Sequence, residues 1–178
     1  MKEYNFSYKF SSIPPIMRRG KHVLIVVKDD QGKYILGSKK IYPEGIYRFI
    51  GGGVDLDENP AEAAVREIEE ELKINVRKTN FRPLAKFIVE VSDEKETFVF
   101  LTFLFLLTTP VSRQLLVASD DLDDLVELSK DEVLELVQKY ENLSDCLVDL
   151  KGDKSGLFKW SDYGKFYSQV HQIAMELA

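Results

Sequence analysis

Continuous runs of apolar residues along this chain predict strands. His22 to Lys28 (HVLIVVK) is a β-branched run of the kind that forms a central strand. The turn residues Asp29 to Gly32 follow it, and they predict a hairpin whose returning strand begins at Tyr34 to Leu36. Two further apolar runs, Leu84 to Val91 and Thr97 to Thr108, flank a short polar segment and predict a longer hairpin. The sequence therefore predicts a sheet that contains two hairpins.

Apolar residues spaced three and four apart predict helices in three places. The first helix begins at Pro60, with Asn59 as its N-cap. Its buried stripe is formed by Ala61, Ala64, Val65, Ile68 and Leu72. Residues Ser129 to Glu132 form a capping box ahead of the amphipathic run Val133 to Tyr140. The last predicted helix is Ser161 to Leu177.

The order of strands and helices is that of one layered domain. No internal repeat, low-complexity tract or linker-like stretch interrupts the 178 residues, so we expect one α/β or α+β domain over 1–178. Residues 1–17 are expected to form an N-terminal extension or an added strand, and 141–178 a C-terminal helical segment. The aromatic segment Tyr4 to Phe10 has two interpretations, an added strand or a contact in a homodimer.

Composition and charge narrow the class of protein. Hydrophobic residues make up 44% of the chain, which is typical of a globular protein, and no apolar run is long enough to span a bilayer. The single cysteine, Cys146, excludes an internal disulfide, so we expect a cytoplasmic protein with Cys146 as a small core residue. The net charge is -6, and acidic clusters lie at Asp55 to Glu71 and Asp120 to Glu135. These clusters would repel a phosphate backbone, so general nucleic-acid binding is not expected.

Three glutamates give the first sign of chemistry. Glu67, Glu70 and Glu71 stand at i, i+3 and i+4, so their carboxylates share one side of a helix. Like charges at this spacing lower helix stability by roughly a few tenths of a kcal/mol per pair, whereas a bound divalent cation reverses the sign. Carboxylate oxygens favour Mg²⁺ or Mn²⁺ over zinc. Glutamate-rich helix faces are also common as solvated surfaces, and the triple glycine Gly51 to Gly53 alone is typical of a flexible loop. The spacing of the whole segment is therefore needed to distinguish a metal site from a solvated helix face beside a flexible loop.

The segment Gly52 to Ile74 resembles the Nudix box, G-x5-E-x7-R-E-U-x-E-E-x-G-U, in which U is a bulky aliphatic residue. Eight of the nine defined positions match, namely Gly52, Glu58, Arg66, Glu67, Ile68, Glu70, Glu71 and Ile74. The resemblance extends over residues 18–140, where the order of strands and helices suits the fold of this family. It implies an α/β fold, the Nudix-type α/β/α sandwich with a mixed central sheet.

Two positions depart from the pattern of this family. Lys73 stands where the box has its second glycine, at the backbone position that ends the helix. Lysine adopts the left-handed conformation at a cost of about 1 kcal/mol, unless the loop takes another route. No metal ligand is lost, so we expect altered helix termination rather than lost activity. The residue before the glycines is Ile50, where many family members carry proline.

The resemblance also implies a reaction and a set of roles. Nudix enzymes hydrolyse a phosphoanhydride bond in a nucleoside diphosphate linked to another moiety, by attack of water on phosphorus with Mg²⁺ or Mn²⁺ as cofactor. By motif position, the expected metal ligands are Glu67, Glu70 and Glu71. Arg66 is expected to orient these glutamates, and Glu58 to support the junction of loop and helix. The candidate catalytic residues are therefore Glu67, Glu70, Arg66 and Glu58.

Candidates for substrate contacts are spread more widely. Those for phosphate are the loop Gly51, Gly52 and Gly53, together with Arg48 and with Lys39 or Lys40 in neighbouring strands. The aromatic residues that would stack on a base, or simply fill the core, are Tyr42, Tyr47, Phe49 and Phe81. Trp160 and Tyr163 open the last predicted helix, where they would cover a pocket or, more simply, pack in the core. A general base on a later loop would come from one of two acidic sets, Asp120, Asp121, Asp123 and Asp124, or Glu90, Asp93, Glu94 and Glu96. Each of these acids taken singly is better explained as a solvated loop residue.

Three hypotheses for the function follow. The first is a pyrophosphohydrolase whose partner is a small-molecule nucleoside diphosphate derivative. The second is a catalytically weak Nudix-fold module that binds a nucleotide or regulates, which would be expected to lose box acids, although all of them remain here. The third is a structural domain with an acidic helix, which leaves the spacing from glycine to glutamate unexplained. The sequence favours the hydrolase and does not name its substrate.

Overall fold

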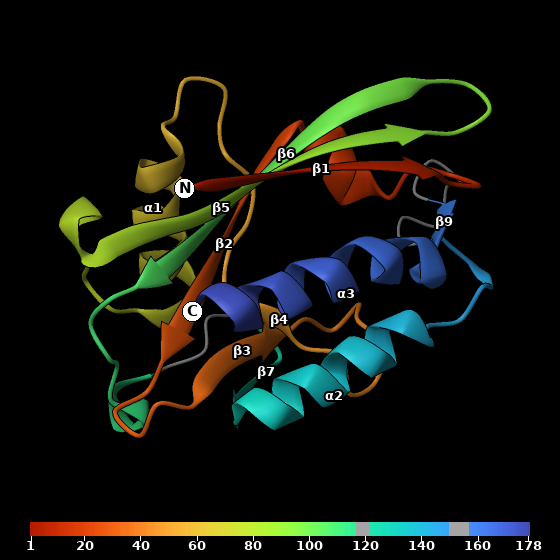
Figure 1. The fold of residues 1–178 in the computed structure, drawn as a ribbon. Helices are drawn as coiled ribbons and strands as arrows, with labels where there is room; N and C mark the ends of the chain where they lie inside the picture. Colours follow the sequence, from red (N-terminus) through yellow and green to blue (C-terminus); the bar gives the residue numbers. More distant parts are fainter. Residues whose placement is uncertain (117–121, 150–156) are drawn as a thin grey trace.

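The structure, a computed structural model, describes residues 1–116, 122–149 and 157–178. A mixed sheet lies at its centre, and helices cover both faces of the sheet (Figure 1). The helices are α1 (Pro60–Leu72) on one face, and α2 (Lys130–Glu141) and α3 (Trp160–Leu177) on the other. The predicted α/β fold with a mixed central sheet is confirmed.

Among the described residues the sheet has seven strands. Their bounds are β1 Lys2–Lys9, β2 Lys21–Lys28, β3 Tyr34–Ser38, β4 Arg48–Phe49, β5 Phe81–Ser92, β6 Thr97–Leu107 and β7 Asp124–Leu128. The order across the sheet is β1-β5-β6-β2-β3-β4, and β7 pairs with β3. The predicted hairpins β2–β3 and β5–β6 are confirmed, whereas β2 with β6 and β1 with β5 are parallel pairs. The sheet is therefore mixed, because it combines these two parallel pairs with the antiparallel pairs of the hairpins.

Strand β2 separates two cores. Its side chains alternate between the faces of the sheet. Val23 and Ile25 join the core that contains Ile68 of α1, whereas Leu24 joins the core that contains Phe166 of α3. All of these side chains are fully buried. The run of apolar residues in β2 is continuous because both faces of this strand are covered.

Helix α1 begins and ends where the sequence predicts. The Asn59 side chain accepts a hydrogen bond from the Ala61 N–H at 2.9 Å, and Glu62 completes the capping box by accepting from the Asn59 N–H at 3.2 Å. Lys73 follows the last turn in the left-handed region, with φ 58°. Of the two routes left open by the sequence, the helix takes the left-handed one. The lysine thus keeps the backbone conformation for which the box has a glycine, so the expectation of an altered helix termination is wrong.

Several expectations outside the box are corrected. Strand β3 ends at Ser38, so Lys39 and Lys40 lie in a loop rather than in a strand. Cys146 is exposed rather than part of the core. The acidic stretch before α2 contains β7, which the sequence did not predict, because its acids interrupt the apolar pattern.

The C-terminal part of the chain ends in α3, which confirms the last predicted helix with a start one residue earlier. A two-stranded sheet, β8 (Leu147–Asp149) with β9 (Leu157–Lys159), precedes α3. Helix α3 packs on α2 and carries a row of rings that includes Tyr163 and Tyr167. Within the described residues, every helix is too short or too polar to cross a bilayer.

Candidate active site

The three glycines form a loop that lies against β2. The Val23 N–H donates to the Gly52 carbonyl oxygen at 2.9 Å, and the Ile25 N–H donates to that of Ile50 at 2.8 Å. Gly51 has φ 141°, and a Cβ at this residue would lie 2.2 Å from the Val23 carbonyl oxygen. A larger residue would have to displace the backbone of the central strand. The sheet therefore fixes the path of the loop.

Gly52 makes room for a carboxylate of α1. A Cβ at Gly52 would lie 2.5 Å from Oε1 and 2.6 Å from Oε2 of Glu67. Such distances are too short for nonbonded atoms, so a side chain at this position would push the carboxylate away. At Gly53 the nearest atom to a Cβ is Nη1 of Arg19, at 3.4 Å, which is an ordinary contact. The first box glycine is thus required by the position of Glu67.

Two of the three box glutamates are buried beneath the loop. Glu67 and Glu71 are 7% and 4% exposed, whereas the side chain of Glu70 is 59% exposed. Oε2 of Glu71 accepts from the Gly51 N–H at 3.0 Å, and its Oε1 lies 3.0 Å from Nζ of Lys39. Burial raises the pKa of the Glu67 carboxyl, and the nearby charge of Glu71 acts in the same direction. A cation bound here would favour the ionised form of the Glu67 carboxyl.

Arg66 connects the loop to the glutamates. Its Nε and Nη2 donate to the two carboxylate oxygens of Glu58, each at 2.9 Å, and these bonds lower the pKa of Glu58. Nη2 also donates to the Gly53 carbonyl oxygen at 2.8 Å. Nη1 donates to Glu67 at 2.7 Å and to Glu70 at 3.2 Å. One guanidinium thus fixes the positions of three carboxylates and of the loop backbone relative to one another.

The donor set suits a cation that prefers oxygen. Glu67, Glu70 and Glu71 offer carboxylate oxygens, which favour Mg²⁺ or Mn²⁺. In the structure Arg66 and Lys39 balance the charge of the buried pair. Within the described part of the chain, no three Asp, Glu, His or Cys side chains already stand at the spacing of metal ligands. The residues fit the cation in kind and in charge, with Glu67 and Glu71 buried beneath the loop and Glu70 exposed on the same helix.

Arg48 supports the loop from inside the protein. It is 4% exposed, and its Nη2 donates to the Gly51 carbonyl oxygen. Its Nε donates to the carbonyl oxygen of Phe49 at 3.4 Å, and its guanidinium lies 5.7 Å from the ring centre of Tyr167. The residue predicted to contact phosphate thus holds the loop in the structure, and its phosphate contact stays a prediction. Lys39, which follows β3, forms an ion pair with the box glutamate Glu71 from outside the box.

The acids considered as a general base on a later loop have structural partners, or they are not grouped with the box glutamates. Asp120 and Asp121 fall outside the described residues. Asp124 accepts from the Tyr47 hydroxyl at 3.0 Å. On the hairpin, Asp93 accepts from two backbone N–H groups of its own turn, and Glu96 pairs with Arg18. Asp123, Glu90 and Glu94 complete the two sets, and among the described residues none of these acids joins the box glutamates in a metal-like group.

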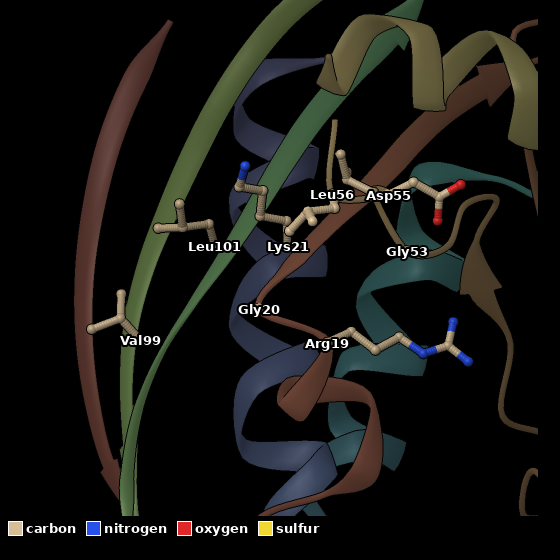
Figure 2. A pocket seen from close by; sticks show the side chains of 9 residues that line it. Arg19, Gly20, Lys21, Gly53, Asp55, Leu56, Val99 and Leu101 are labelled. Carbon is tan, nitrogen blue, oxygen red and sulfur yellow. The ribbon is translucent and has the colours of Figure 1, made fainter. Parts of the chain in front are cut away.

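Two hollows border the glycine loop, and Arg19 lines both. The larger, of about 710 Å³, lies over β2 and β6 beside Gly53. Leu56 and Val99 on its rim are 91% and 58% exposed, so it is open to solvent. Figure 2 shows the Arg19 side chain extending away from Val99 and Leu101. Arg19 thus stands between this open hollow and the second one.

The second hollow, of about 270 Å³, is the aromatic pocket. The rings that line it are Tyr42, Phe158, Trp160 and Tyr163. The cations Arg19, Lys39 and Arg48 line it as well, together with Gly51 and Gly52. Phe158, Trp160 and Tyr163 belong to the same buried core as Phe49, whereas Phe81 belongs to the other core, and neither Phe49 nor Phe81 lines the pocket. The pocket therefore connects a group of rings to the glycine loop.

Comparison with known proteins identifies one family. The family model described as the NUDIX domain matches residues 18–147. The E. coli dihydroneopterin triphosphate pyrophosphohydrolase is 19% identical, with a TM-score of 0.54 over 66% of this chain and 85% of that one. A Nudix hydrolase from M. smegmatis is 13% identical, with a TM-score of 0.53 over 89% and 86%. A MutT protein from Bacillus halodurans is 27% identical, with a TM-score of 0.52 over 65% and 72%. No match is found among curated proteins.

Proposed function

The chain belongs to the Nudix family, and we propose that it hydrolyses a phosphoanhydride bond in a nucleoside diphosphate linked to another moiety, with Mg²⁺ or Mn²⁺ as cofactor. As a member of this family the chain is an enzyme, a pyrophosphohydrolase whose substrates belong to the class of nucleoside diphosphate derivatives. The observation that carries the proposal is the fit of the Glu67 carboxylate against Gly52, which directs a buried acid of α1 at the loop.

We assign the cation to the three box glutamates. Glu67 and Glu71 lie beneath the loop, and Glu70 stands one turn from Glu67 on the same helix. A diphosphate is a polyanion that these carboxylates repel. The chemistry that a bound Mg²⁺ or Mn²⁺ supplies is neutralisation of that repulsion and activation of water. The buried carboxylates are the part of the chain that makes this binding favourable.

Arg66 and Glu58 act as positioning residues in this proposal. The bidentate pair between them fixes the guanidinium plane, so that its remaining donors face Gly53 and Glu67. Phosphoryl transfer depends mainly on positioning and charge, so a small shift of Glu67 is costly. We therefore assign Arg66 and Glu58 to holding the glutamates at the loop.

Lys39 and Arg19 are the cations assigned to the phosphates. Lys39 lies between Glu71 and the aromatic pocket, with its side chain 31% exposed. When the charge of Glu71 is neutralised in another way, the Lys39 ammonium is free to bind a phosphate oxygen. Arg19 is exposed and makes no ion pair with any described residue. Both side chains thus place positive charge beside the glycine loop.

The proposed activity is tested on a panel of nucleotide sugars, dinucleoside polyphosphates, ADP-ribose, NADH and (deoxy)nucleoside triphosphates. At least one compound should release phosphate-containing products with Mg²⁺ or Mn²⁺, and EDTA should abolish the release. In ¹⁸O-labelled water one product phosphate should carry the label, because water attacks phosphorus. Turnover that persists in EDTA would contradict the assigned cofactor.

A catalytically weak Nudix-fold module that binds a nucleotide or regulates is the second candidate function. It is favoured by the contact of Lys39 with Glu71, which already neutralises one box acid, and by the outward position of Glu70. Inactivity across the whole panel with both metals, together with saturable binding of a panel compound, would favour this alternative. Turnover of any compound that is lost in Glu70→Gln would exclude it.

A further inference from the structure

Strand β1 forms a long, open edge of the sheet. Among the described residues it pairs with β5 alone, and its other side has no neighbouring strand. It has eight residues, whereas β7, which also pairs with a single strand, has five. Proteins commonly protect an edge with a short strand, a bulge, a proline or a charge. The register of β1 with β5 is continuous, and the segment from Tyr4 to Tyr8 contains neither a proline nor a charged residue.

The free hydrogen-bonding groups of β1 belong to its odd-numbered residues. The backbone N–H and C=O groups of successive residues in a strand point to opposite sides. The Phe10 N–H donates to the Ser92 carbonyl oxygen of β5 at 2.8 Å, so the even-numbered residues are directed at β5. The residues that present their backbone groups at the outer side are Glu3, Asn5, Ser7 and Lys9. A further strand can therefore add to β1 through these residues.

The side chains of the even-numbered residues form an aromatic row along this edge. Tyr4, Phe6 and Tyr8 are half-buried and pack against the core on the α3 side of the sheet. The rings of Tyr4 and Phe6 lie 5.6 Å and 6.2 Å from that of Phe87 in β5, and the Tyr8 ring lies 6.0 Å from that of Phe6. Aromatic side chains at the edge are suited to contact with aromatic side chains of an added strand.

Charge complementarity indicates that the added strand is β1 of a second copy. When two copies of β1 run antiparallel about a twofold axis at Phe6, Glu3 of each copy lies opposite Lys9 of the other. Two ion pairs then form, because the axis repeats the contact. A twofold axis at Asn5 or at Ser7 would place no opposite charges of β1 face to face. The charges of β1 therefore select one register.

The same register suits the uncharged residues. Asn5 of one copy lies opposite Ser7 of the other, and both carry free backbone groups, so the two residues can exchange two hydrogen bonds. Tyr4 lies opposite Tyr8, and Phe6 lies opposite Phe6 of the second copy. These are the non-hydrogen-bonded positions of an antiparallel ladder, where opposite side chains come closest and aromatic pairs stabilise the sheet. Charge, backbone and ring positions thus agree on one arrangement.

We propose that the chain forms a homodimer in which two copies of β1 pair antiparallel about Phe6 and join the two sheets into one. The pairing covers the free edge and extends the aromatic row across the twofold axis. Glu3 already pairs with Lys86 of β5 at 3.1 Å, and its side chain is 54% exposed, so it is open to a second cation. No residue of β1 lines the hollows beside the glycine loop, so the dimer is independent of the proposed activity.

Sedimentation velocity of the purified chain over a range of concentrations measures the association. The mass should rise with concentration towards twice the 20.5 kDa of one chain. Lys9→Glu sets like charges opposite each other at two places, so the dissociation constant should rise about tenfold. The double variant Glu3→Lys with Lys9→Glu exchanges the charges and should return to within about threefold of wild type. Lys130→Glu, at an exposed site of α2, is the matched charge reversal and should leave the association unchanged.

Ser7→Pro tests the backbone part of the contact. The Ser7 N–H points outward, so proline removes hydrogen bonds of the dimer and none to β5. The dissociation constant should rise at least about tenfold, because each dimer loses one such bond on either side of the axis. The unfolding midpoint, compared with wild type at a concentration at which both are monomeric, checks that the fold is retained.

The outcomes test the surface and the register separately. A mass of one chain at all concentrations up to about 100 µM would overturn the homodimer. A dimer that is as stable in Lys9→Glu and Ser7→Pro as in wild type would show that another surface pairs, and it would overturn the assignment to β1. Failure of the double variant to regain the affinity that Lys9→Glu loses would overturn the register at Phe6. Weakening in both single variants and recovery in the double variant support the proposal.

Discussion

The box segment, Gly52 to Ile74, and the aromatic pocket are built in opposite ways. The box segment is continuous in the chain, and Arg66 connects its loop to its helix through hydrogen bonds of 2.7 to 3.2 Å. The aromatic pocket joins residues from both ends of the chain and is formed mainly by ring contacts.

The difference teaches where chemistry and selectivity are located. The box segment holds charged groups in fixed relative positions, which is what the chemical step requires. The pocket offers apolar rings beside the cations Arg19, Lys39 and Arg48, which suits binding rather than the chemical step. We therefore expect substitutions in the box segment to lower kcat, and substitutions in the pocket to raise KM with kcat unchanged.

The largest expected effect is that of Gly52→Ala. The added Cβ would lie 2.5 Å from the Glu67 carboxylate, so the carboxylate has to move, and kcat should fall about a hundredfold. Gly53→Ala is the matched control, because its Cβ meets only the Arg19 side chain at 3.4 Å. Steady-state kinetics on the panel substrate compares the two. Equal losses in both variants would show that the Gly52 contact with Glu67 is unimportant.

A smaller loss is expected for Arg66→Lys. Lysine keeps the charge but cannot bridge Glu58, Glu67 and the Gly53 carbonyl, so kcat should fall about tenfold with little change in KM. Arg113→Lys is the control, because Arg113 pairs with Glu127 at a 45% exposed site away from the loop. Full activity of Arg66→Lys would mean that charge alone is sufficient at this position.

The pocket should respond through KM. Tyr42→Ala removes a ring that borders the pocket, so we expect KM to rise about tenfold while kcat stays the same. Tyr47→Ala, a change to a half-buried ring that does not line the pocket, is the comparison. A fall in kcat without a rise in KM for Tyr42→Ala would erase the distinction between the two regions.

The smallest expected effect concerns the end of α1. Lys73 has φ 58°, where glycine is unstrained, so Lys73→Gly should raise the free energy of unfolding by about 0.5–1 kcal/mol and leave kcat unchanged. Urea unfolding measures the gain. Asn75→Gly controls for added chain flexibility, because Asn75 does not have a positive φ. A loss of stability in Lys73→Gly would show that the left-handed lysine is not strained.

The box segment was predictable because its information is local. Spacing alone places Glu67, Glu70 and Glu71 on one side of a helix, and Asn59 and Pro60 mark where that helix begins. What spacing leaves open is the direction of each side chain. Burial of two glutamates and exposure of the third depend on how α1 packs against β2.

The aromatic pocket was not predictable because its information is tertiary. A ring that lines a pocket and a ring that fills a core look alike in sequence, and only the fold brings Tyr42 next to Trp160. The contact of Lys39 with Glu71 has no sequence signal, since 32 positions separate them and neither spacing nor periodicity links them. Strand β7 was missed because Asp124 and Glu127 break its apolar pattern.

The most direct test of the account is Mn²⁺ binding by the purified protein, measured by electron paramagnetic resonance together with turnover. The matched variants are Glu71→Gln, which changes a buried box acid, and Glu69→Gln, which changes an exposed acid of the same helix. We predict that wild type and Glu69→Gln bind Mn²⁺ saturably and gain activity as the site fills, and that Glu71→Gln loses both. Equal Mn²⁺ binding and equal turnover in the two variants would contradict the assignment of the cation to the box glutamates.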